Sequence, residues 1–239
     1  MVNIDTVYQT VLALANKEQR GYITPQEFNL FANLAQMEIF EQYFYDLNQF
    51  KRGPSQKDRK SDTAMLVEDK IKLFQKVYPG SLLSSSQQFP ENFYRFISLT
   101  SNDGREIEVM SKEDFTRANS LPLLMPTANR PICYLKKDSI EIAPSWIPPN
   151  GLHSFDLNYV AKPKKPNWTY VVINGSALWN PSAVDAAGLP LPVHFELHAS
   201  EQKTLILKIL QLAGVSIKDY NVAQLASQKE SSEIQQEKS

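Results

Sequence analysis

The first apolar pattern along the chain has the spacing of a helix. Its apolar residues recur every three or four positions: Ile4, Val7, Tyr8, Val11, Leu14 and Ala15. This spacing predicts an amphipathic helix with Asp5 near its start. The pattern ends over residues 16–21, and Gly21 stands where helices commonly stop.

A second helix is predicted by a clear start signal. Thr24 is a good N-cap residue, and Pro25 stands where a missing amide costs nothing. Glu27, at the third helical position, completes the spacing of a capping box. Together the two segments predict an N-terminal helical hairpin.

The second helix is rich in aromatic residues on nearly every side. Two helices cannot bury that much apolar surface by themselves, so something else must cover it. Two coverings are open: the rest of the same chain or a neighbouring subunit. The candidate interface residues are Phe28, Phe31, Phe40, Tyr43 and Phe44.

Residues 51–63 form a polar, mainly basic loop. Five cations lie in it: Lys51, Arg52, Lys57, Arg59 and Lys60. They are candidates for contact with DNA or an acidic partner, and a solvated loop is the alternative. An amphipathic segment with Val67, Ile71, Phe74 and Val77 follows and ends near Pro79 and Gly80. The sequence thus predicts a helical region over 4–80.

The pattern changes to that of strands over residues 89–180. Strand candidates are 93–99, 107–109, 132–135, 140–142, 155–160 and 168–173. Residues 102–104 and 136–138 are the expected hairpin turns, and Asn174-Gly175 is the expected end of the last strand. Ser111 begins a short helix with the spacing of a capping box.

Helical signal returns over 190–226, with a main helix predicted from Val193 to Leu212 and a stop at Gly214. Residues 227–239 are too polar to build a core, which predicts a flexible tail or a helix that is ordered only by a partner. The expected fold class is therefore α+β, in which the helical hairpin and the closing helix pack with the strand-rich central region.

Composition excludes several classes of protein. The formal net charge of -1 argues against nucleic-acid binding over a broad surface. Cys133 is the only cysteine, so the chain has no internal disulfide, which fits assembly in a reducing cytoplasm. No apolar run is long enough to span a bilayer, and the N-terminus lacks the pattern of a signal peptide. We therefore expect no membrane partner.

Catalytic chemistry is not evident in the sequence. His194 and His198 have the i,i+4 spacing of a helical metal pair, but Glu196 would point about 200° around the helix from His194. Glycine-rich phosphate loops and the Gly-x-Ser-x-Gly motif are absent. Cys133 lies in an apolar strand candidate and predicts a core residue. We therefore expect no enzyme activity, no cofactor and no metal.

The order of elements resembles one family. Its parts are the aromatic hairpin through Phe50, then 89–94 (Phe-Pro-Glu-Asn-Phe-Tyr), 130–134, 140–145, 156–163, 166–168 and 189–192 (Leu-Pro-Leu-Pro) before a closing helix. This resembles the adaptor or ring proteins beneath the portal of short-tailed phages, especially those of crAss-like phages.

The resemblance implies a structural virion protein of the phage neck. Such a protein forms a ring of about twelve copies that docks on the portal, extends the DNA channel and accepts the next tail or neck component. DNA is then only passing cargo, and no catalytic residue is implied. The alternative is another virion structural or assembly protein, such as a tail-tube or capsid-associated protein.

Overall fold

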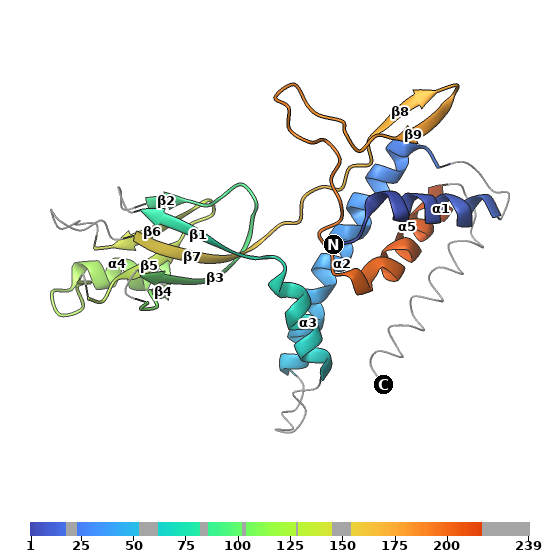
Figure 1. Cartoon of the computed structure of the whole chain (residues 1–239). Coiled ribbons are helices and arrows are strands. Elements are labelled where there is room, and N and C mark those ends of the chain that lie inside the picture. The colour runs from blue at the N-terminus through green and yellow to red at the C-terminus, as the bar shows by residue number, and fades with distance from the viewer. Residues whose placement is uncertain are drawn as a thin grey trace. The chain divides into compact units, whose positions relative to one another are not determined.

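The structure is a computed structural model that describes residues 1–17, 23–52, 62–81, 86–101, 104–127, 129–144 and 154–216. Figure 1 shows its helices and strands, which belong to the expected α+β class. The chain forms two compact units. Unit 1 contains residues Met1–Leu73 and Pro163–Ser239, and unit 2 contains residues Phe74–Lys162.

This division corrects the expected regions at 4–80, 89–180 and 190–226. Unit 2 is an insertion between the two halves of unit 1, so residues 163–180 belong with the helices and not with the central strands. The reason is that Trp168 packs against Tyr8 of the first helix, with ring centroids 4.1 Å apart. The predicted tail at 227–239 lies outside the described residues.

Four α-helices build unit 1: α1 (Ile4–Lys17), α2 (Pro25–Arg52), α3 (Asp62–Lys72) and α5 (Gln202–Ser216). The predicted capping box at the start of α2 is confirmed. The Thr24 amide donates to Glu27 Oε2 at 3.0 Å, and the Glu27 amide donates to Thr24 Oγ1 at 3.3 Å. The bonds that the Thr24 amide and the Thr24 hydroxyl donate to the Glu27 carboxylate hold the pKa of Glu27 below its ordinary value.

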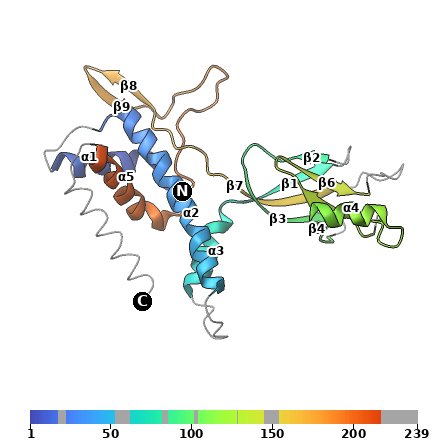
Figure 2. The same cartoon turned by 180° about the vertical axis from the view of Figure 1, so that it is seen from behind.

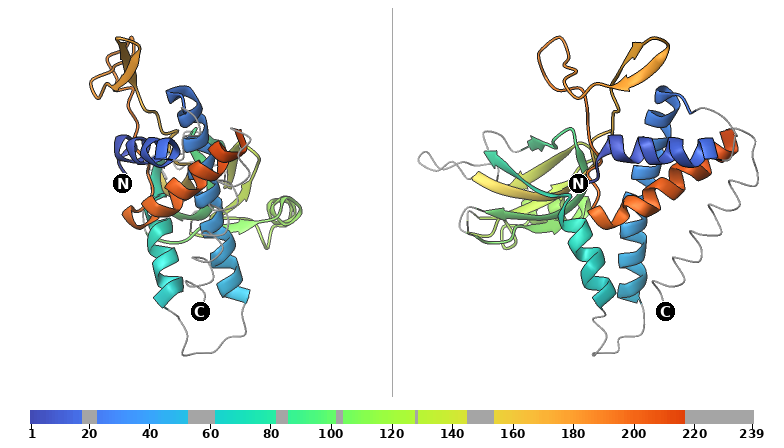
Figure 3. Two further views of the ribbon diagram at one scale, coloured as in Figure 1. Left: turned by 90° about the vertical axis from the view of Figure 1, so that its right-hand side faces the viewer. Right: turned by 45° about the vertical axis from the view of Figure 1, so that its right-hand side comes forward.

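Helix α5 packs against both α1 and α2, and α3 packs against α2. Figures 1 and 3 show that α1 runs across α2 and not along it, so the predicted hairpin is a crossed pair. Lys208 on α5 is buried and pairs with Glu38 on α2 at 3.0 Å, while Lys70 on α3 pairs with Glu201 at 2.5 Å. Because each buried charge has a partner, these contacts fix how the helices pack.

The predicted start of the closing helix at Val193 is wrong. Residues before α5 are extended: Val193 bridges to Asn167, and Phe195 bridges to Val2. A 3₁₀ turn, Ala199–Glu201, then leads into α5. The helix also passes Gly214, its predicted stop, and ends at Ser216. The apolar residues at 193, 195 and 197 fit alternation along a strand as well as a helix, and pairing with the N-terminus decides between them.

Unit 2 contains two sheets, seen from behind in Figure 2. The first has the order β1 (Gln75–Ser81), β7 (Ser154–Ala161), β3 (Phe93–Ser101) and is antiparallel. The second has the order β2 (Ser86–Gln88), β6 (Ser139–Ala143), β5 (Ile132–Leu135), β4 (Glu108–Met110). One buried core draws residues from both sheets, including Leu99, Leu157, Cys133 and Ile142.

Several local predictions in unit 2 are confirmed. Strands β5 and β6 form the expected hairpin, with Tyr134 opposite Glu141. Ser111 caps α4 (Lys112–Ser120), which packs on β5 through Phe115. Past Lys72, however, the expected amphipathic segment is strand β1, because this stretch pairs with β7 from the distant end of the unit.

No helix among the described residues has the length and apolarity needed to cross a membrane.

Unit 1 also contains a small two-stranded sheet, β8 (Tyr170–Ile173) and β9 (Ser176–Trp179). Figure 3 shows this hairpin projecting beyond the helices of unit 1.

Candidate assembly interface

The aromatic residues predicted for an interface divide into two groups. Phe28, Phe40 and Tyr43 are buried in unit 1, so for these three the covering is the chain itself. Phe28 lies edge-on to Tyr8 at 4.7 Å. Phe31 and Phe44 are only half-buried, and Phe44 lies edge-on to Phe40 at 5.1 Å. A direct interface role is therefore corrected for the first three residues and stays a prediction for Phe31 and Phe44.

The solvent side of α2 carries exposed apolar residues outside the candidate interface set. Leu30 is 66% exposed and Leu34 is 55% exposed, and Tyr45 lies further along the helix. Acidic residues Glu38 and Glu41 interrupt this stripe and are exposed. A stripe interrupted by charge is typical of an ordinary helix surface.

The predicted basic contact loop lies mostly outside the described residues. Lys51 and Arg52 are the last residues of α2. Lys57, Arg59 and Lys60 fall in the part of the chain that the structure does not describe. The contact of this loop with DNA or a partner stays a prediction.

Trp168 is the anchor of the projecting hairpin. Its indole Nε1 donates to Asp5 Oδ1 of α1 at 2.9 Å, and its amide donates to Asn29 Oδ1 of α2 at 2.8 Å. The Asn29 amide group donates back to the Trp168 carbonyl at 3.1 Å. The rings of Tyr170 and Trp179 stack on Trp168 at 5.8 and 5.7 Å. The root of the hairpin is thus fixed to two helices.

A second polar contact holds the segment that leads into the hairpin. Gln36 of α2 is fully buried. Its side-chain nitrogen donates to the Lys164 carbonyl at 2.8 Å, and its oxygen accepts the Glu196 amide at 3.1 Å. Gln36 and Asn29 are two turns apart on one face of α2, so one helix holds both the entry and the exit of the 164–196 segment.

Strands β8 and β9 form a tight hairpin with apolar residues on both faces. Asn174 and Gly175 have φ values of 51° and 78°, as a type I′ turn requires. The register places Val171 opposite Leu178 and Val172 opposite Ala177. Val172 is 65% exposed, Ile173 is 52% exposed and Leu178 is 49% exposed. A two-stranded hairpin in water ordinarily keeps one polar face, and this one has none.

The exposed apolar surface continues into the segment that follows. Val184, Leu189 and Leu191 are exposed, and Val184 bridges to Pro190. The Asp185 side chain accepts the Ala187 and Leu189 amides at 2.8 Å, which orders the loop locally. From Pro166 to Phe195, Asp185 is the only Asp, Glu, Lys or Arg, although such residues make up 21% of the chain. This near-absence of charge was the signal in the sequence that could have revealed the surface.

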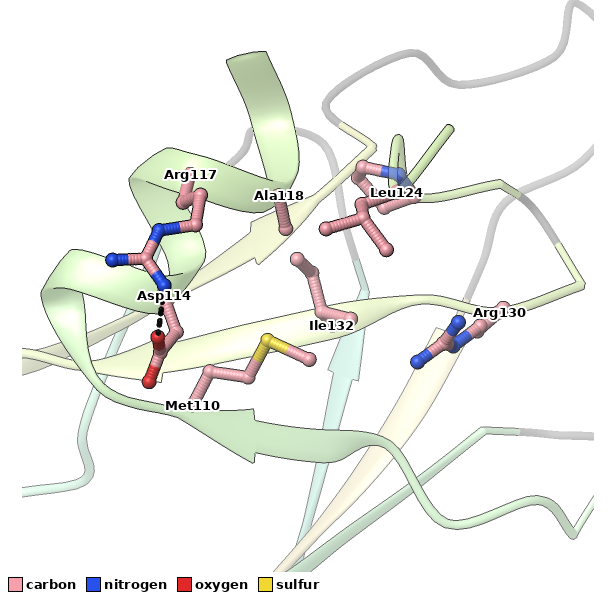
Figure 4. A pocket seen from close by; sticks show the side chains of 8 residues that line it. Met110, Asp114, Arg117, Ala118, Leu124, Arg130 and Ile132 are labelled. Carbon is pink, nitrogen blue, oxygen red and sulfur yellow. Dashed lines mark ion pairs between the residues drawn. The ribbon is translucent and has the colours of Figure 1, made fainter. Parts of the chain in front are cut away.

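Unit 2 has a shallow hollow of about 160 Å³ between α4 and β5 (Figure 4). In Figure 4 the side chains of Leu124 and Ile132 point toward each other across it. Arg117 at its rim pairs with Asp114 at 3.7 Å, and Arg130 pairs with Glu108 at 3.5 Å. The hollow is smaller than the several hundred cubic ångströms of an ordinary cofactor site.

Reactive groups do not gather in the described part of the chain. No cluster of three or more His, Cys, Asp or Glu residues there could hold a metal ion. His194 and His198 lie in the segment before α5 and not in a helix, so their i,i+4 spacing does not place them on one helix face. His194 Nδ1 accepts the Ile4 amide at 3.3 Å, and His198 Nδ1 accepts the Ser200 amide at 3.2 Å. Burial raises the pKa of the Cys133 thiol to about 12, which keeps it protonated and unreactive near neutral pH.

Comparisons with known proteins assign no family. No protein-family model matches the chain, and no curated protein matches it. The chain's own residues and the order of its elements are therefore the evidence for its function. Its strongest structural element is the anchored, charge-free hairpin surface of unit 1.

Proposed function

We propose that this protein is a non-enzymatic structural subunit of a virion, which forms a ring in the neck of a short-tailed phage. The observation that carries the proposal is the surface of residues 166–195, which is apolar, nearly free of charge and held by Trp168 on two helices. Exposed apolar surface of this kind marks a site of protein association. The resemblance to phage adaptor and ring proteins supplies the kind of assembly.

The charge of the chain supports this role. A lining that neutralised many phosphates would bind DNA tightly, whereas a channel must let DNA slide. The formal net charge of -1 fits a subunit that DNA passes without stable contact. The proposed partners are copies of the chain itself, the portal protein and the next tail or neck component, with assembly in the host cytoplasm.

Electron microscopy of the full chain, alone and mixed with the portal protein of the same particle, tests the proposal. We expect closed rings of about twelve copies that decorate the portal. A chain that stays monomeric and never decorates the portal would falsify the proposal. Open tubes or binding to capsid shells in place of the portal would favour the alternative, a tail-tube or capsid-associated protein.

A further inference from the structure

The edges of the β8–β9 hairpin point to a specific mode of association. In an antiparallel pair, opposite residues alternate between hydrogen-bonded pairs and pairs whose amides point outward. The Asn180 amide donates to the Thr169 carbonyl at 2.9 Å, so the pair 169–180 is of the bonded kind. Bonded pairs recur at every second position, so the pairs 171–178 and 173–176 are bonded as well. The pair between them, Val172 and Ala177, is of the other kind, and its amides point outward.

Neither outer edge of this hairpin pairs with another strand in the described part of the chain. Native proteins guard such edges with lysine, other charges, proline or bulges. Residues 170–179 contain no charged residue and no proline, and their register is regular. The edges are therefore suited to pair with another strand.

The absence of Lys and Arg from this surface limits the kinds of partner that it can bind. Nucleic acid is held mainly through Lys and Arg contacts to phosphate, and between Pro166 and Phe195 there is neither. Hydrocarbon cannot satisfy the outward amides of Val172 and Ala177, so the interior of a membrane does not fit these edges. A strand edge that is equally apolar and uncharged fits both requirements, and each further copy of the chain presents one.

We infer that the hairpin of one copy pairs with the same hairpin of the next, the outer edge of β9 against the outer edge of β8. Strands β8 and β9 run in opposite directions. Rotation about an axis along the strands therefore sets β8 of the next copy antiparallel to β9 of the first. This head-to-tail order uses both edges of every hairpin and leaves none open once a ring closes. The inference rests on the proposed function, because it names the contact that builds the ring.

The size of the edge agrees with a ring. Each strand has only four residues. The surface that one strand edge can bury is therefore far smaller than the roughly 800 Å² per partner of a standard interface. The neighbouring residues Val184, Leu189 and Leu191 enlarge the contact with further exposed apolar surface. One such contact is weak, so we expect closure, in which every copy makes two contacts, to hold the assembly together.

Proline at an outward amide tests edge pairing without breaking the hairpin. Val172→Pro and Ala177→Pro each remove a donor that the hairpin itself does not use, and edge strands tolerate proline at such positions. Val172→Pro blocks the β8 edge, and Ala177→Pro blocks the β9 edge. Near-ultraviolet circular dichroism of the stacked Trp168 and Trp179 checks that the hairpin stays intact.

Sedimentation velocity and mass photometry of the full chain, alone and with portal, then report assembly. We expect wild-type rings and monomers for each proline variant alone. When the two variants are mixed at high concentration, we expect a weak, concentration-dependent heterodimer that grows no further. The heterodimer follows because Val172→Pro still offers β9 and Ala177→Pro still offers β8. The matched surface control, Leu30→Lys with Leu34→Lys on α2, should assemble as wild type does.

Other outcomes separate this inference from the proposed function. Rings of both proline variants overturn edge pairing and leave the ring function standing. A homodimer of one variant alone overturns the head-to-tail order. A wild-type chain that is monomeric both alone and with portal overturns the inference together with the ring function. Flotation of the monomer with phosphatidylcholine vesicles, without self-association, overturns the choice of partner.

Discussion

Two hairpins of this chain differ in how their edges and faces are covered. The β5–β6 hairpin of unit 2 has β4 on one edge and β2 on the other. It buries Cys133 and Ile142 in a core, and Lys136 pairs with Glu141 on its surface at 2.6 Å. The β8–β9 hairpin of unit 1 is anchored only at its root and carries apolar residues on both faces.

The two hairpins therefore differ in whether their own unit satisfies their edges and covers their apolar residues. The β5–β6 hairpin is complete within its own unit, since its edges are paired and its exposed residues are polar. The β8–β9 hairpin has the composition of a buried strand pair but is covered only at its root, where Tyr170 and Trp179 stack on Trp168. Packing inside unit 1 does not explain its apolar residues, because Val172 and Ile173 are more than half exposed.

Trp168→Ala tests the anchor of the β8–β9 hairpin and should have the largest effect. The ring is 1% exposed and supports Tyr8, Tyr170 and Trp179. Its loss should lower the free energy of unfolding of unit 1 by about 3–5 kcal/mol, the range for large aromatic to alanine changes in cores. Urea unfolding followed by circular dichroism measures the change. Trp168→Phe, which keeps a ring, should lose clearly less, and equal losses would contradict a packing role.

Ile142→Ala and Ile173→Ala compare the two hairpins with one substitution. Ile142 is 3% exposed in the β6 strand, so truncation should cost about 2–5 kcal/mol of the stability of unit 2. Ile173 is 52% exposed, so the monomer should change by less than about 0.5 kcal/mol. Thermal unfolding of both variants at monomeric concentrations is the measurement. A large loss from Ile173→Ala would mean that the hairpin has intramolecular cover.

Local signals were readable from the sequence. The Thr24–Glu27 capping box and the β5–β6 hairpin follow from short-range spacing, and both are confirmed. Strand β1 was missed because Phe74 and Val77 fit helical spacing, while the pairing of Val77 with Asn158 decides the element. Residues 193–198 were missed for the same reason, since Phe195 pairs with Val2. Contacts between distant segments leave no periodic trace in the sequence.

The candidate surface was only partly readable. Aromatic content pointed to α2, where Phe28 and Phe40 proved to be core residues. The surface that is apolar and uncovered lies at 166–195, where Asn174-Gly175 was read as the end of a strand and is the turn of a hairpin. Aromatic residues are typical both of a core and of an interface, whereas a long interval with a single charged residue is the better indicator of a surface that binds a partner.

Thr24→Ala tests how far the hairpin anchor depends on the first turn of α2, which begins at Pro25 and leads to Asn29. Loss of the cap should cost about 1 kcal/mol. Because the pKa of Glu27 is lowered in the folded protein, the stabilisation by this contact depends on pH. Its stabilisation is complete above the ordinary carboxyl value of 4.5 and is lost as pH falls through the lower folded-state pKa. Stability measured against pH should show a weaker acid loss in the variant, and an unchanged profile would contradict the cap.

Val171→Glu with Leu178→Lys gives the β8–β9 hairpin the kind of charged pair that β5–β6 already has. The two residues lie directly opposite each other, and both are exposed. Opposite charges at such a position attract weakly, so the stability of the monomer should stay within about 0.5 kcal/mol. Self-association should nevertheless fall, because the next copy would have to desolvate both charges to cover this face. Chemical denaturation and sedimentation velocity on the same preparation separate the two effects, and unchanged association would show that this face stays open to water in the assembly.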